Sequence, residues 1–370
     1  MNRRKIVTII GTRPEAIKMA PVIRELGRRD GVFHHVVVTT AQHREMLDQV
    51  LRVFDIKPDI DLALMKQDQG LADFASRSLS ALSDLLARLR PDSILIQGDT
   101  TTVMTAALAA FYQNIRVGHV EAGLRSFDRR NPFPEEINRR IATCLADMHF
   151  APTERARMNL LREGTPEESV FVTGNTIVDA LRSIDTDGAF EDGNLSKIGL
   201  EGKRFLLVTA HRRENHGEPL RSLCRALKTL AEMFDDIEII YPVHLNVNVI
   251  RSATEELGGA RVHLLKPVSY SDLLRLMARC YFILTDSGGV QEEAPSFHKP
   301  VLVLREVTER PELIEAGGGK VIGTSHDRVV EEAARLLTDR SEFERMKAAV
   351  NPFGDGHAAE RIADILAQRV

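Results

Sequence analysis

The sequence contains few cysteines, no excess of basic residues and no long apolar run. Its three cysteines, Cys144, Cys224 and Cys280, are far apart, and their spacing matches neither a metal site nor a disulfide framework. Such usage is typical of a protein in a reducing compartment. The formal net charge of -4 and the isoelectric point near 6.3 argue against a nucleic-acid-binding protein. Any anion must therefore be bound by a local cluster of cations.

The first residues resemble the start of a secretion signal, because basic side chains precede an apolar run. That run ends at Gly11 and continues into the polar residues 12–15 (TRPE), so it is far too short for the apolar region of a signal peptide. No other apolar stretch approaches the length needed to cross a bilayer. We expect a cytoplasmic protein without a membrane partner.

Apolar, strand-like runs alternate with helical patterns along the whole chain, which predicts parallel sheets with right-handed crossovers. A chain of 370 residues is too long for one ordinary α/β core. We predict two doubly wound, Rossmann-like α/β domains, residues 1–173 and 174–356, with a helix over 357–370 packing back on the first. The predicted strands are 5–10, 36–39, 93–97, 117–120, 148–151, 170–173, 204–209, 237–241, 262–264, 281–285 and 301–304. The predicted helices include 15–28, 72–89, 101–111, 220–233, 246–257 and 271–277.

A small-residue turn follows the predicted strand 281–285. Ser287, Gly288 and Gly289 precede a helical run, and such a turn points free backbone N–H groups at an anion that glycine lets approach closely. Glu292 and Glu293 follow on the helix and are suited to accept hydrogen bonds from ribose hydroxyls. The turn predicts a site for a nucleotide diphosphate. The alternative interpretation is a glycine-rich turn that only caps a helix.

The loop after the first predicted strand carries two cations. Its sequence, GTRPEAIK, lacks the GxGxxG pattern, so it does not predict a dinucleotide fingerprint. Arg13 at the helix entry and Lys18 one turn later suit a phosphate or diphosphate. The alternative is that Arg13 pairs with Glu15 and that Lys18 is a solvated surface residue.

Carboxylates follow two successive strands of the first predicted domain. Asp99 and Glu121 occupy strand ends that lie about 5 Å apart in a parallel sheet, so both can face one ligand. Glu135 and Glu136 come from the next loop, before a helix. Such carboxylates are the common means of dividing acid and base roles. The structural alternative for Asp99 is a helix cap worth about 1 kcal/mol.

Cationic residues follow the strands of the second predicted domain. His211 and Arg212 come after strand 204–209, His244 after strand 237–241, and Arg310 after strand 301–304. His211 can neutralise or protonate a leaving phosphate, and Arg310 is a further phosphate ligand. Since one half supplies acids and the other a phosphate turn, the sequence predicts an enzyme that acts on a nucleotide sugar between two domains.

Nine motifs in order resemble those of one family. They are GTRPEAIK, QGDTTTV, GHVEAGLRS, PFPEEINR, HRREN, YPVHLN, TDSGGVQEEAP, TERPE and NPFGDG, and they extend from residue 11 to 356. Together they are similar to the non-hydrolysing UDP-N-acetylglucosamine 2-epimerases of bacteria. The resemblance implies a glycosyltransferase-B-like fold, a homodimer, and interconversion of UDP-GlcNAc and UDP-ManNAc without a metal or nicotinamide cofactor, for surface polysaccharide synthesis.

The resemblance also implies roles for individual residues. The acidic catalytic set corresponds to Asp99, Glu121 and Glu135, with His211 assisting at the diphosphate. The positions that contact UDP are Arg13, Lys18, Ser287, Gly288, Gly289, Glu293 and Arg310. Some members bind a second substrate molecule as an activator, near Gln42, Arg212 and His244. Residues 65–70 of this chain lack the arginine expected at that activator site.

The chemistry of the sugar is consistent with these residues. The hydrogen on carbon 2 is not next to a carbonyl, so simple deprotonation is unavailable. Elimination of UDP to a 2-acetamidoglucal, followed by re-addition, gives the epimer and needs a base, an acid and a site that retains UDP. The alternatives are a hydrolysing epimerase that releases ManNAc and UDP, a glycosyltransferase of the same fold, and a non-catalytic nucleotide-sugar sensor.

Overall fold

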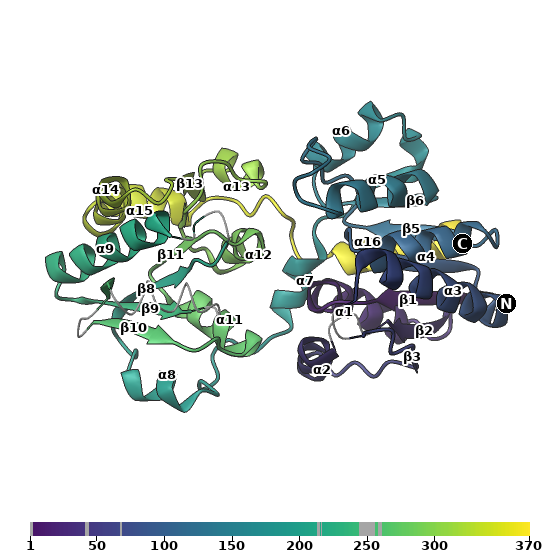
Figure 1. The fold of residues 1–370 in the computed structure, drawn as a ribbon, viewed down its shortest axis with the longest axis horizontal. Coiled ribbons are helices and arrows are strands. Elements are labelled where there is room, and N and C mark those ends of the chain that lie inside the picture. The colour runs from purple at the N-terminus through teal and green to yellow at the C-terminus, as the bar shows by residue number, and fades with distance from the viewer. Residues whose placement is uncertain are drawn as a thin grey trace. The chain divides into compact units, whose positions relative to one another are not determined.

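The computed structural model describes residues 3–40, 44–66, 69–212, 215, 217–243, 256–257 and 261–370. The predicted helix 246–257 therefore falls almost entirely outside the described residues. The chain divides into two compact units (Figure 1). One consists of Met1–Ser183 with Phe353–Val370, and the other of Ile184–Pro352. Each unit is a parallel sheet covered by helices.

The first unit contains a seven-stranded sheet in the order β3-β2-β1-β4-β5-β6-β7. Its strands are β1 (Arg4–Ile10), β2 (Phe33–Thr39), β3 (Ile60–Asp61), β4 (Ser93–Gln97), β5 (Arg116–Val120), β6 (Met148–Ala151) and β7 (Val170–Val172). Strands β2 and β3 lie on one side of β1, and β4 to β7 lie on the other. The loops after β1 and β4 therefore leave in opposite directions, and a crevice forms between them. A Cβ on Gly11, directly after β1, would lie 2.4 Å from Oγ1 of the buried Thr102, so the base of this crevice is tightly packed.

Buried apolar strands and two helices form the core of this unit. The helices of the whole unit are α1 (Arg13–Arg28), α2 (Arg44–Val53), α3 (Leu71–Leu89), α4 (Thr101–Phe111), α5 (Glu135–Leu145), α6 (Glu154–Arg162), α7 (Thr176–Arg182) and α16 (Ala358–Arg369). The two core helices are α3 and α4. Val7, Ile9 and Ile94 are fully buried against the Ala-rich α4 and the apolar side of α3. Burial of each such side chain contributes about 1.5–3 kcal/mol, and it fixes the strand ends from which the polar loops extend.

The first unit extends beyond the predicted boundary after residue 173. Helix α7 packs on α1 and α16. The N–H of Asn175 donates to the carbonyl of Phe353 at 2.7 Å, and Asp179 accepts from the N–H of Ala359 at 2.8 Å. Since both contacts attach α7 to the C-terminal segment, α7 and α16 belong to the same unit as β1.

The second unit contains a six-stranded sheet in the order β10-β9-β8-β11-β12-β13. Its strands are β8 (Arg204–Thr209), β9 (Ile237–Pro242), β10 (Val262–Leu265), β11 (Phe282–Thr285), β12 (Val301–Val303) and β13 (Gly319–Val321). Its helices are α8 (Gly193–Ile198), α9 (Glu218–Met233), α11 (Tyr270–Arg279), α12 (Gly288–Glu293), α13 (Pro311–Glu315), α14 (His326–Thr338) and α15 (Arg340–Lys347). Strands β9 and β10 lie on one side of β8, and β11 to β13 lie on the other. The loops after β8 and β11 therefore flank a second crevice.

The predicted strands coincide with observed strands to within a few residues at each end. Strand β11 begins at Phe282 instead of Tyr281, and α12 begins at Gly288 instead of the predicted Val290, because Ser287 caps it. Strands β3 and β13 were not predicted from the sequence. Within the described part of the chain, no helix has the length and apolar character of a membrane span.

Candidate functional site

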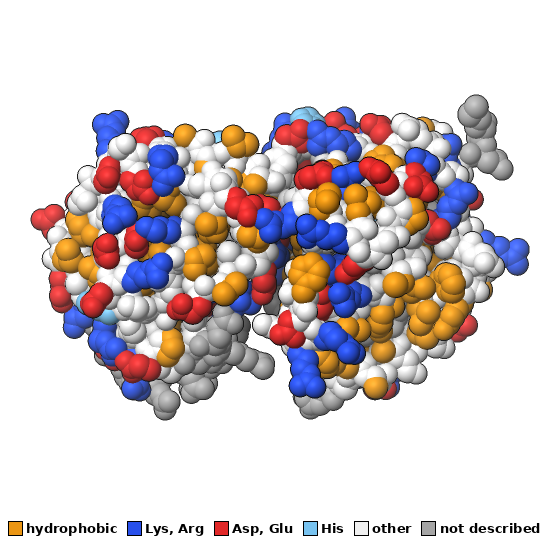
Figure 2. Space-filling model, turned by 90° about the horizontal axis from the view of Figure 1, so that it is seen from above, with side chains coloured by type: hydrophobic (Ala, Val, Ile, Leu, Met, Phe, Trp, Pro, Cys, Tyr) orange, Lys and Arg blue, Asp and Glu red, His pale blue; other side chains and the backbone are white. Residues whose placement is uncertain are grey.

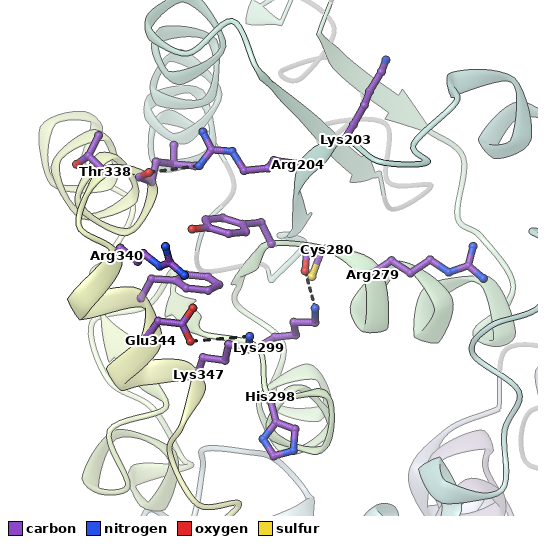
Figure 3. Close-up of a pocket in the computed structure, with 13 residues that line it drawn as sticks. Lys203, Arg204, Arg279, Cys280, His298, Lys299, Thr338, Arg340, Glu344 and Lys347 are labelled. Atoms are coloured by element: carbon purple, nitrogen blue, oxygen red, sulfur yellow. Dashed lines mark hydrogen bonds and ion pairs between the residues drawn. The ribbon is translucent and has the colours of Figure 1, made fainter.

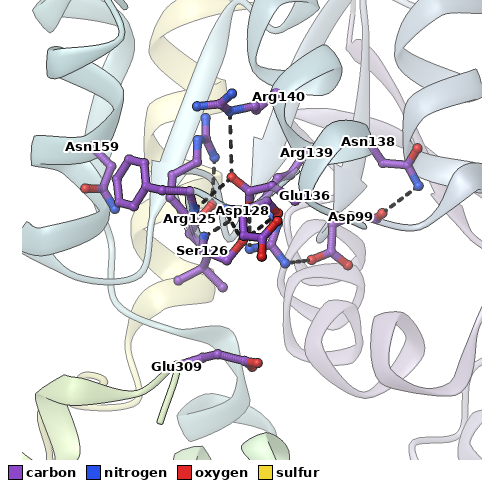
Figure 4. Close-up of polar contacts among 12 residues, drawn as sticks. Asp99, Arg125, Ser126, Asp128, Glu136, Asn138, Arg139, Arg140, Asn159 and Glu309 are labelled. Atoms are coloured by element: carbon purple, nitrogen blue, oxygen red, sulfur yellow. Dashed lines mark hydrogen bonds and ion pairs between the residues drawn. The ribbon is translucent and has the colours of Figure 1, made fainter. Parts of the chain in front are cut away.

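Asp99 lies two residues beyond the end of β4 and pairs with Arg139 of α5 (Figure 4). Its backbone carbonyl accepts from Nδ2 of Asn138 at 3.0 Å. The alternative interpretation of Asp99 as the cap of α4 is wrong, because the cap is Thr100, whose hydroxyl accepts from the N–H of Val103 at 3.3 Å. The carboxylate of Asp99 is therefore held by a cation from a neighbouring helix and remains partly exposed to a ligand.

Glu121 follows β5 directly, and both of its carboxylate oxygens are engaged. Oε1 pairs with Lys18 of α1, and Oε2 accepts from Nε2 of Gln97 at the end of β4. The alternative interpretation of Lys18 as a solvated surface residue is therefore wrong. Glu121 has a φ of 64°, a left-handed conformation that costs a non-glycine residue about 1–3 kcal/mol and that is concentrated at functional sites. Gln97 was missed in the sequence, although it stands at the strand end before Gly98.

A third carboxyl group is buried beside Asp99. Glu15 is 1% exposed and accepts from the N–H of Gly11 at 2.7 Å and from the hydroxyl of Thr12 at 2.8 Å. Burial raises the pKa of Glu15 to about 7, with the charge of Asp99 adding to the rise and hydrogen bonds from Thr12 and Gly11 opposing it. The alternative Arg13–Glu15 pair is therefore not formed. Arg13 is exposed at the first turn of α1.

The two glutamates of the PFPEEINR motif have different environments. Both lie in the first turn of α5, not before it as predicted. Glu136 is fully buried and accepts from the N–H groups of Ser126 at 3.0 Å and Phe127 at 3.3 Å, so it holds the loop after β5 (Figure 4). Glu135 is only partly buried, and its carboxylate is available to a ligand.

His119, inside β5, supports this edge of the sheet without being exposed. Its Nε2 lies 2.7 Å from the carbonyl oxygen of Gly98, and burial lowers its pKa to about 4. His119 is therefore neutral near pH 7 and fixes the turn between Gln97 and Asp99. The first unit thus places Asp99 and Glu121 just beyond the carboxyl ends of the neighbouring strands β4 and β5, with Lys18 of α1 paired to Glu121.

In the second unit, a buried aspartate organises the loop after β8. Oδ2 of Asp286 accepts from the N–H groups of His211 and Arg212, both at 2.9 Å, and from Nδ2 of Asn215 at 3.0 Å. Oδ1 of Asp286 lies 3.7 Å from Nδ1 of His211, whose side chain is 43% exposed. Asp286 therefore orients a histidine that a ligand can reach. No role for Asp286 was predicted from the sequence.

The guanidinium groups of Arg212 and Arg310 lie beside the turn at Ser287, where α12 begins. The hydroxyl of Ser287 accepts from the N–H of Val290 at 3.5 Å. A Cβ on Gly288 would lie 3.7 Å from Nη2 of Arg212 and 3.8 Å from Nη2 of Arg310. Gly288 and Gly289 have ordinary helical dihedral angles, so the backbone does not require glycine there. Both guanidinium groups lie at ordinary contact distance from this position, so an anion bound at the turn would lie beside two cations.

The acidic residues of α12 have separate partners. Nε of Arg310 donates to Oε1 of Glu292 at 2.5 Å, so Glu292 positions the arginine. Oε1 of Glu293 accepts from the hydroxyl of Tyr270, the first residue of α11, at 2.8 Å. Glu293 is thereby fixed close to the Ser287 turn. Tyr270 was missed, because nothing in the sequence connects it with the turn.

The activator residues inferred from the resemblance are only partly described. Gln42 and His244 lie outside the described residues. Nη1 of Arg212 lies 3.7 Å from Oε1 of Glu309. The activator role of all three stays a prediction.

Comparison with known proteins gives consistent matches over the whole chain. The sequence model of the family described as UDP-N-acetylglucosamine 2-epimerase matches residues 24–367. The chain is 49% identical over 367 residues to the UDP-N-acetylglucosamine 2-epimerase of Bacillus subtilis, covering 99% of this chain and 96% of that protein. It is 48% identical over 369 residues to the Escherichia coli K12 protein of the same name, covering 98% of each.

Solved structures match both units. The structure of UDP-GlcNAc 2-epimerase from Neisseria meningitidis bound to UDP-GlcNAc aligns with a TM-score of 0.88 at 44% identity, covering 99% of this chain and 100% of that one. The Methanocaldococcus jannaschii enzyme in complex with UDP-GlcNAc and UDP aligns with a TM-score of 0.80 at 33% identity, covering 98% and 99%. These matches confirm the predicted fold class of two parallel-sheet α/β units, which is glycosyltransferase-B-like.

Proposed function

The chain belongs to the UDP-N-acetylglucosamine 2-epimerase family, and we propose that it interconverts UDP-GlcNAc and UDP-ManNAc without hydrolysis. The observation that carries the proposal is the placement of Asp99 and Glu121, two carboxylates held by cations, at adjacent strand ends of one crevice. Carboxylates in this arrangement can remove and return a proton on opposite faces of one carbon. The arginines at the Ser287 turn complement them by binding the diphosphate.

The reaction proceeds by elimination and re-addition. A carboxylate takes the proton from carbon 2, the bond between carbon 1 and the phosphate oxygen breaks, and its electron pair leaves with UDP. Carbons 1 and 2 become doubly bonded in a 2-acetamidoglucal. A carboxyl group then delivers a proton to the other face of carbon 2, and the phosphate oxygen attacks carbon 1 again. Asp99, Glu121 and Glu135 supply the proton transfers.

The leaving group is stabilised by cations and backbone donors. We assign the diphosphate to Arg310, to the N–H groups of Ser287, Gly288 and Gly289, and to His211, because Asp286 orients its exposed imidazole. Fixed donors aimed at developing charge lower the barrier for departure of the leaving group. Glu293 accepts from the ribose hydroxyls, and Tyr270 holds its carboxylate in place.

Arg13 and Lys18 complete the cationic set in the first unit. Arg13 is exposed and available to the diphosphate. Lys18 extends from the helix that follows β1 and pairs with Glu121. It is therefore shared between this carboxylate and the diphosphate. A cation between a carboxylate and a phosphate keeps both groups charged without mutual repulsion.

We also propose that the enzyme is a homodimer in the cytoplasm. The first unit exposes several large apolar side chains, and Figure 2 shows hydrophobic side chains gathered on one face of it. Phe111, Tyr112, Phe127 and Phe133 are among the exposed large apolar side chains of this unit. Contiguous exposed apolar surface is characteristic of protein interfaces. The cysteines are free thiols, which supports a reducing compartment. Sedimentation analysis is expected to give twice the mass of the 41.3 kDa chain.

The experiment that tests the function is product analysis. The full chain is incubated with UDP-GlcNAc, and the sugars are followed by proton NMR. The expected result is an equilibrium mixture in which UDP-ManNAc appears and the sugars remain attached to UDP. Steady accumulation of free ManNAc and UDP would instead identify a hydrolase, and absence of turnover without an added acceptor would indicate a transferase.

A further inference from the structure

A polar pocket with a volume of about 510 Å³ opens in the Ile184–Pro352 unit (Figure 3). Arg204, Tyr281 and Lys299 line it, and they stand at or just before the amino ends of β8, β11 and β12. Ser287 and His211 follow the carboxyl ends of β11 and β8. The pocket therefore lies at the opposite edge of the sheet from the nucleotide turn and is separate from it.

The lining of this pocket has an excess of positive charge. Its charged residues are Lys203, Arg204, Arg279, Lys299, Arg340, Lys347 and Glu344. Outside the lining, Glu238 pairs with Lys203 and Asp236 with Arg204. Six cations and three carboxylates thus leave an excess of three positive charges around the cavity.

Three of the cations have no acidic neighbour. Among the described residues, no carboxylate lies within 4 Å of Arg279, Lys299 or Arg340. Nζ of Lys299 donates to the carbonyl oxygen of Cys280 at 2.8 Å, and Arg279 donates to backbone carbonyls. Burial lowers the pKa of Lys299, and repulsion from Lys347 contributes to the same effect. An anion in the cavity would relieve this repulsion and offset the desolvation.

The aromatic wall restricts the kind of anion. The rings of Tyr281 and Phe343 stack with centroids 4.1 Å apart and an interplanar angle of 4°, and Cζ of Arg204 lies 5.2 Å from the centroid of the Tyr281 ring. Because these contacts already cover the Tyr281 ring, it presents little surface on which a nucleobase can stack. The volume is within the range of small-molecule sites and exceeds what inorganic phosphate fills.

We propose that this pocket binds a small phosphate monoester, whose phosphoryl group contacts Lys299 and Arg340, two of the labelled cations in its lining (Figure 3). A phosphate monoester carries about -1.5 to -2 charges near pH 7, which matches an excess of cations. Lysine and arginine are the side chains that bind phosphoryl groups most strongly, by charge and by charge-assisted hydrogen bonds. The organic part of the ester occupies the remaining volume beside Arg279 and His298. The inference does not depend on the proposed reaction.

Titration calorimetry on the full chain in saturating UDP, at low ionic strength, tests the proposal. The probes are glucose 6-phosphate and 3-phosphoglycerate, with inorganic phosphate and citrate as separate arms. At least one ester is expected to bind more tightly than either inorganic phosphate or citrate. Its affinity should fall about tenfold or more in Arg340→Ala and in Lys299→Gln, as expected for loss of a charged hydrogen-bond donor. Lys228→Ala, which removes an exposed lysine on α9 outside the pocket, should bind as the wild type does.

Three results would overturn the proposal. They are failure of both esters to bind in saturating UDP, equal affinity for inorganic phosphate or citrate, and unchanged affinity in Arg340→Ala. Arg340 is exposed at the start of α15, so its replacement leaves the fold intact and gives a clear result even if Lys299→Gln unfolds. Epimerisation by Arg340→Ala, assayed separately, should match that of the wild type.

Discussion

Lys18 and Glu121 form a nearly buried ion pair although 103 positions separate them in the sequence. Their side chains are 13% and 6% exposed. The pair joins the helix after β1 to the end of β5, and Gln97 at the end of β4 donates to the second carboxylate oxygen. The three central strands of the first sheet are thereby connected at their carboxyl ends, and both oxygens of the Glu121 carboxylate are held in place.

Replacement of Lys18 by methionine should affect both stability and turnover. It leaves a buried carboxylate without its cation, which costs about 3–5 kcal/mol in a fully buried pair and somewhat less here because Lys18 is partly exposed. Denaturant unfolding and kcat measurements check this, and we expect kcat to fall by about 100-fold or more. Lys57→Met, at an exposed lysine of the same unit, is the control. A Lys18→Met enzyme with wild-type kcat would contradict the role of the pair.

Asp99 and Thr100 provide a matched test of function against capping. Asp99→Asn keeps the size of the side chain but removes its charge, so epimerisation should be lost while the cap of α4 persists. Thr100→Ala should lower the free energy of unfolding by about 1 kcal/mol with turnover largely retained, because it removes the cap hydroxyl. The opposite pattern, an active Asp99→Asn and an inactive Thr100→Ala, would return Asp99 to a structural role.

Asp286 should control the affinity for UDP through the loop after β8. Asp286→Ala removes the acceptor of three hydrogen bonds, which frees the backbone of His211 and Arg212. We expect the Kd for UDP to rise about tenfold or more and the free energy of unfolding to fall by about 2–4 kcal/mol. Calorimetry and urea unfolding measure these changes. The exposed Asp235→Ala serves as the control, and UDP affinity equal to wild type in Asp286→Ala would refute the positioning role.

The proposed contact between Glu293 and the ribose predicts discrimination against deoxyribose. Wild-type protein should bind UDP more tightly than 2′-deoxy-UDP or 3′-deoxy-UDP, by about tenfold for a hydrogen bond to a charged group. Glu293→Gln should largely abolish this preference, and Tyr270→Phe should weaken it by releasing the carboxylate. For each of the three proteins, the affinity for UDP is divided by the affinity for the deoxy analogue, and the ratio is compared with that of the wild type. Equal ratios in all three proteins would place the ribose elsewhere.

Buried histidines make stability depend on pH. Burial lowers the pKa of His119 to about 4, so between about pH 6.5 and 4 the unfolded chain binds a proton that the native protein does not. Its contribution to stability is complete above pH 6.5 and is lost as the pH falls, by about 3 kcal/mol at most. Glu15, with a pKa raised to about 7, acts in the opposite direction, since its contribution is lost as the pH rises from 4.5 to 7.

Urea unfolding of variants at pH 7.5 and pH 5 tests the contribution of His119. His119→Gln should lose less stability than the wild type on acidification, because it removes a group that only the unfolded chain protonates. His34→Gln, at an exposed position of β2, should follow the wild type. Identical pH dependence in His119→Gln and the wild type would show that His119 titrates normally in the native state.

Much of the fold could be predicted because parallel strands buried on both faces are continuous apolar runs. Strand β8 was located to the residue, and β1 and β11 to within one residue. The Asp-Thr-Thr-Thr run shows what such patterns leave open. Its members can all cap a helix, and only the backbone geometry assigns the cap to Thr100 and frees Asp99.

Long-range polar contacts could not be predicted. The sequence places Glu121 at a strand end, but its pairing with Lys18 depends on the order of strands β1, β4 and β5 in the sheet. Tyr270 and Asp286 were missed for the same reason, because the hydrogen bonds that give them a role come from segments distant in the chain. Strand ends thus identify candidate acids, whereas the groups that orient them require the tertiary structure.

Deuterium incorporation at carbon 2 is the most direct test of the central claim that Asp99 and Glu121 exchange a proton with the sugar. Wild-type protein is incubated with UDP-GlcNAc in deuterated water, and the nucleotide sugars are analysed by NMR and mass spectrometry. We predict UDP-ManNAc that carries one deuterium at carbon 2, and no exchange in Asp99→Asn. UDP-ManNAc that retains the original hydrogen at carbon 2 would contradict it.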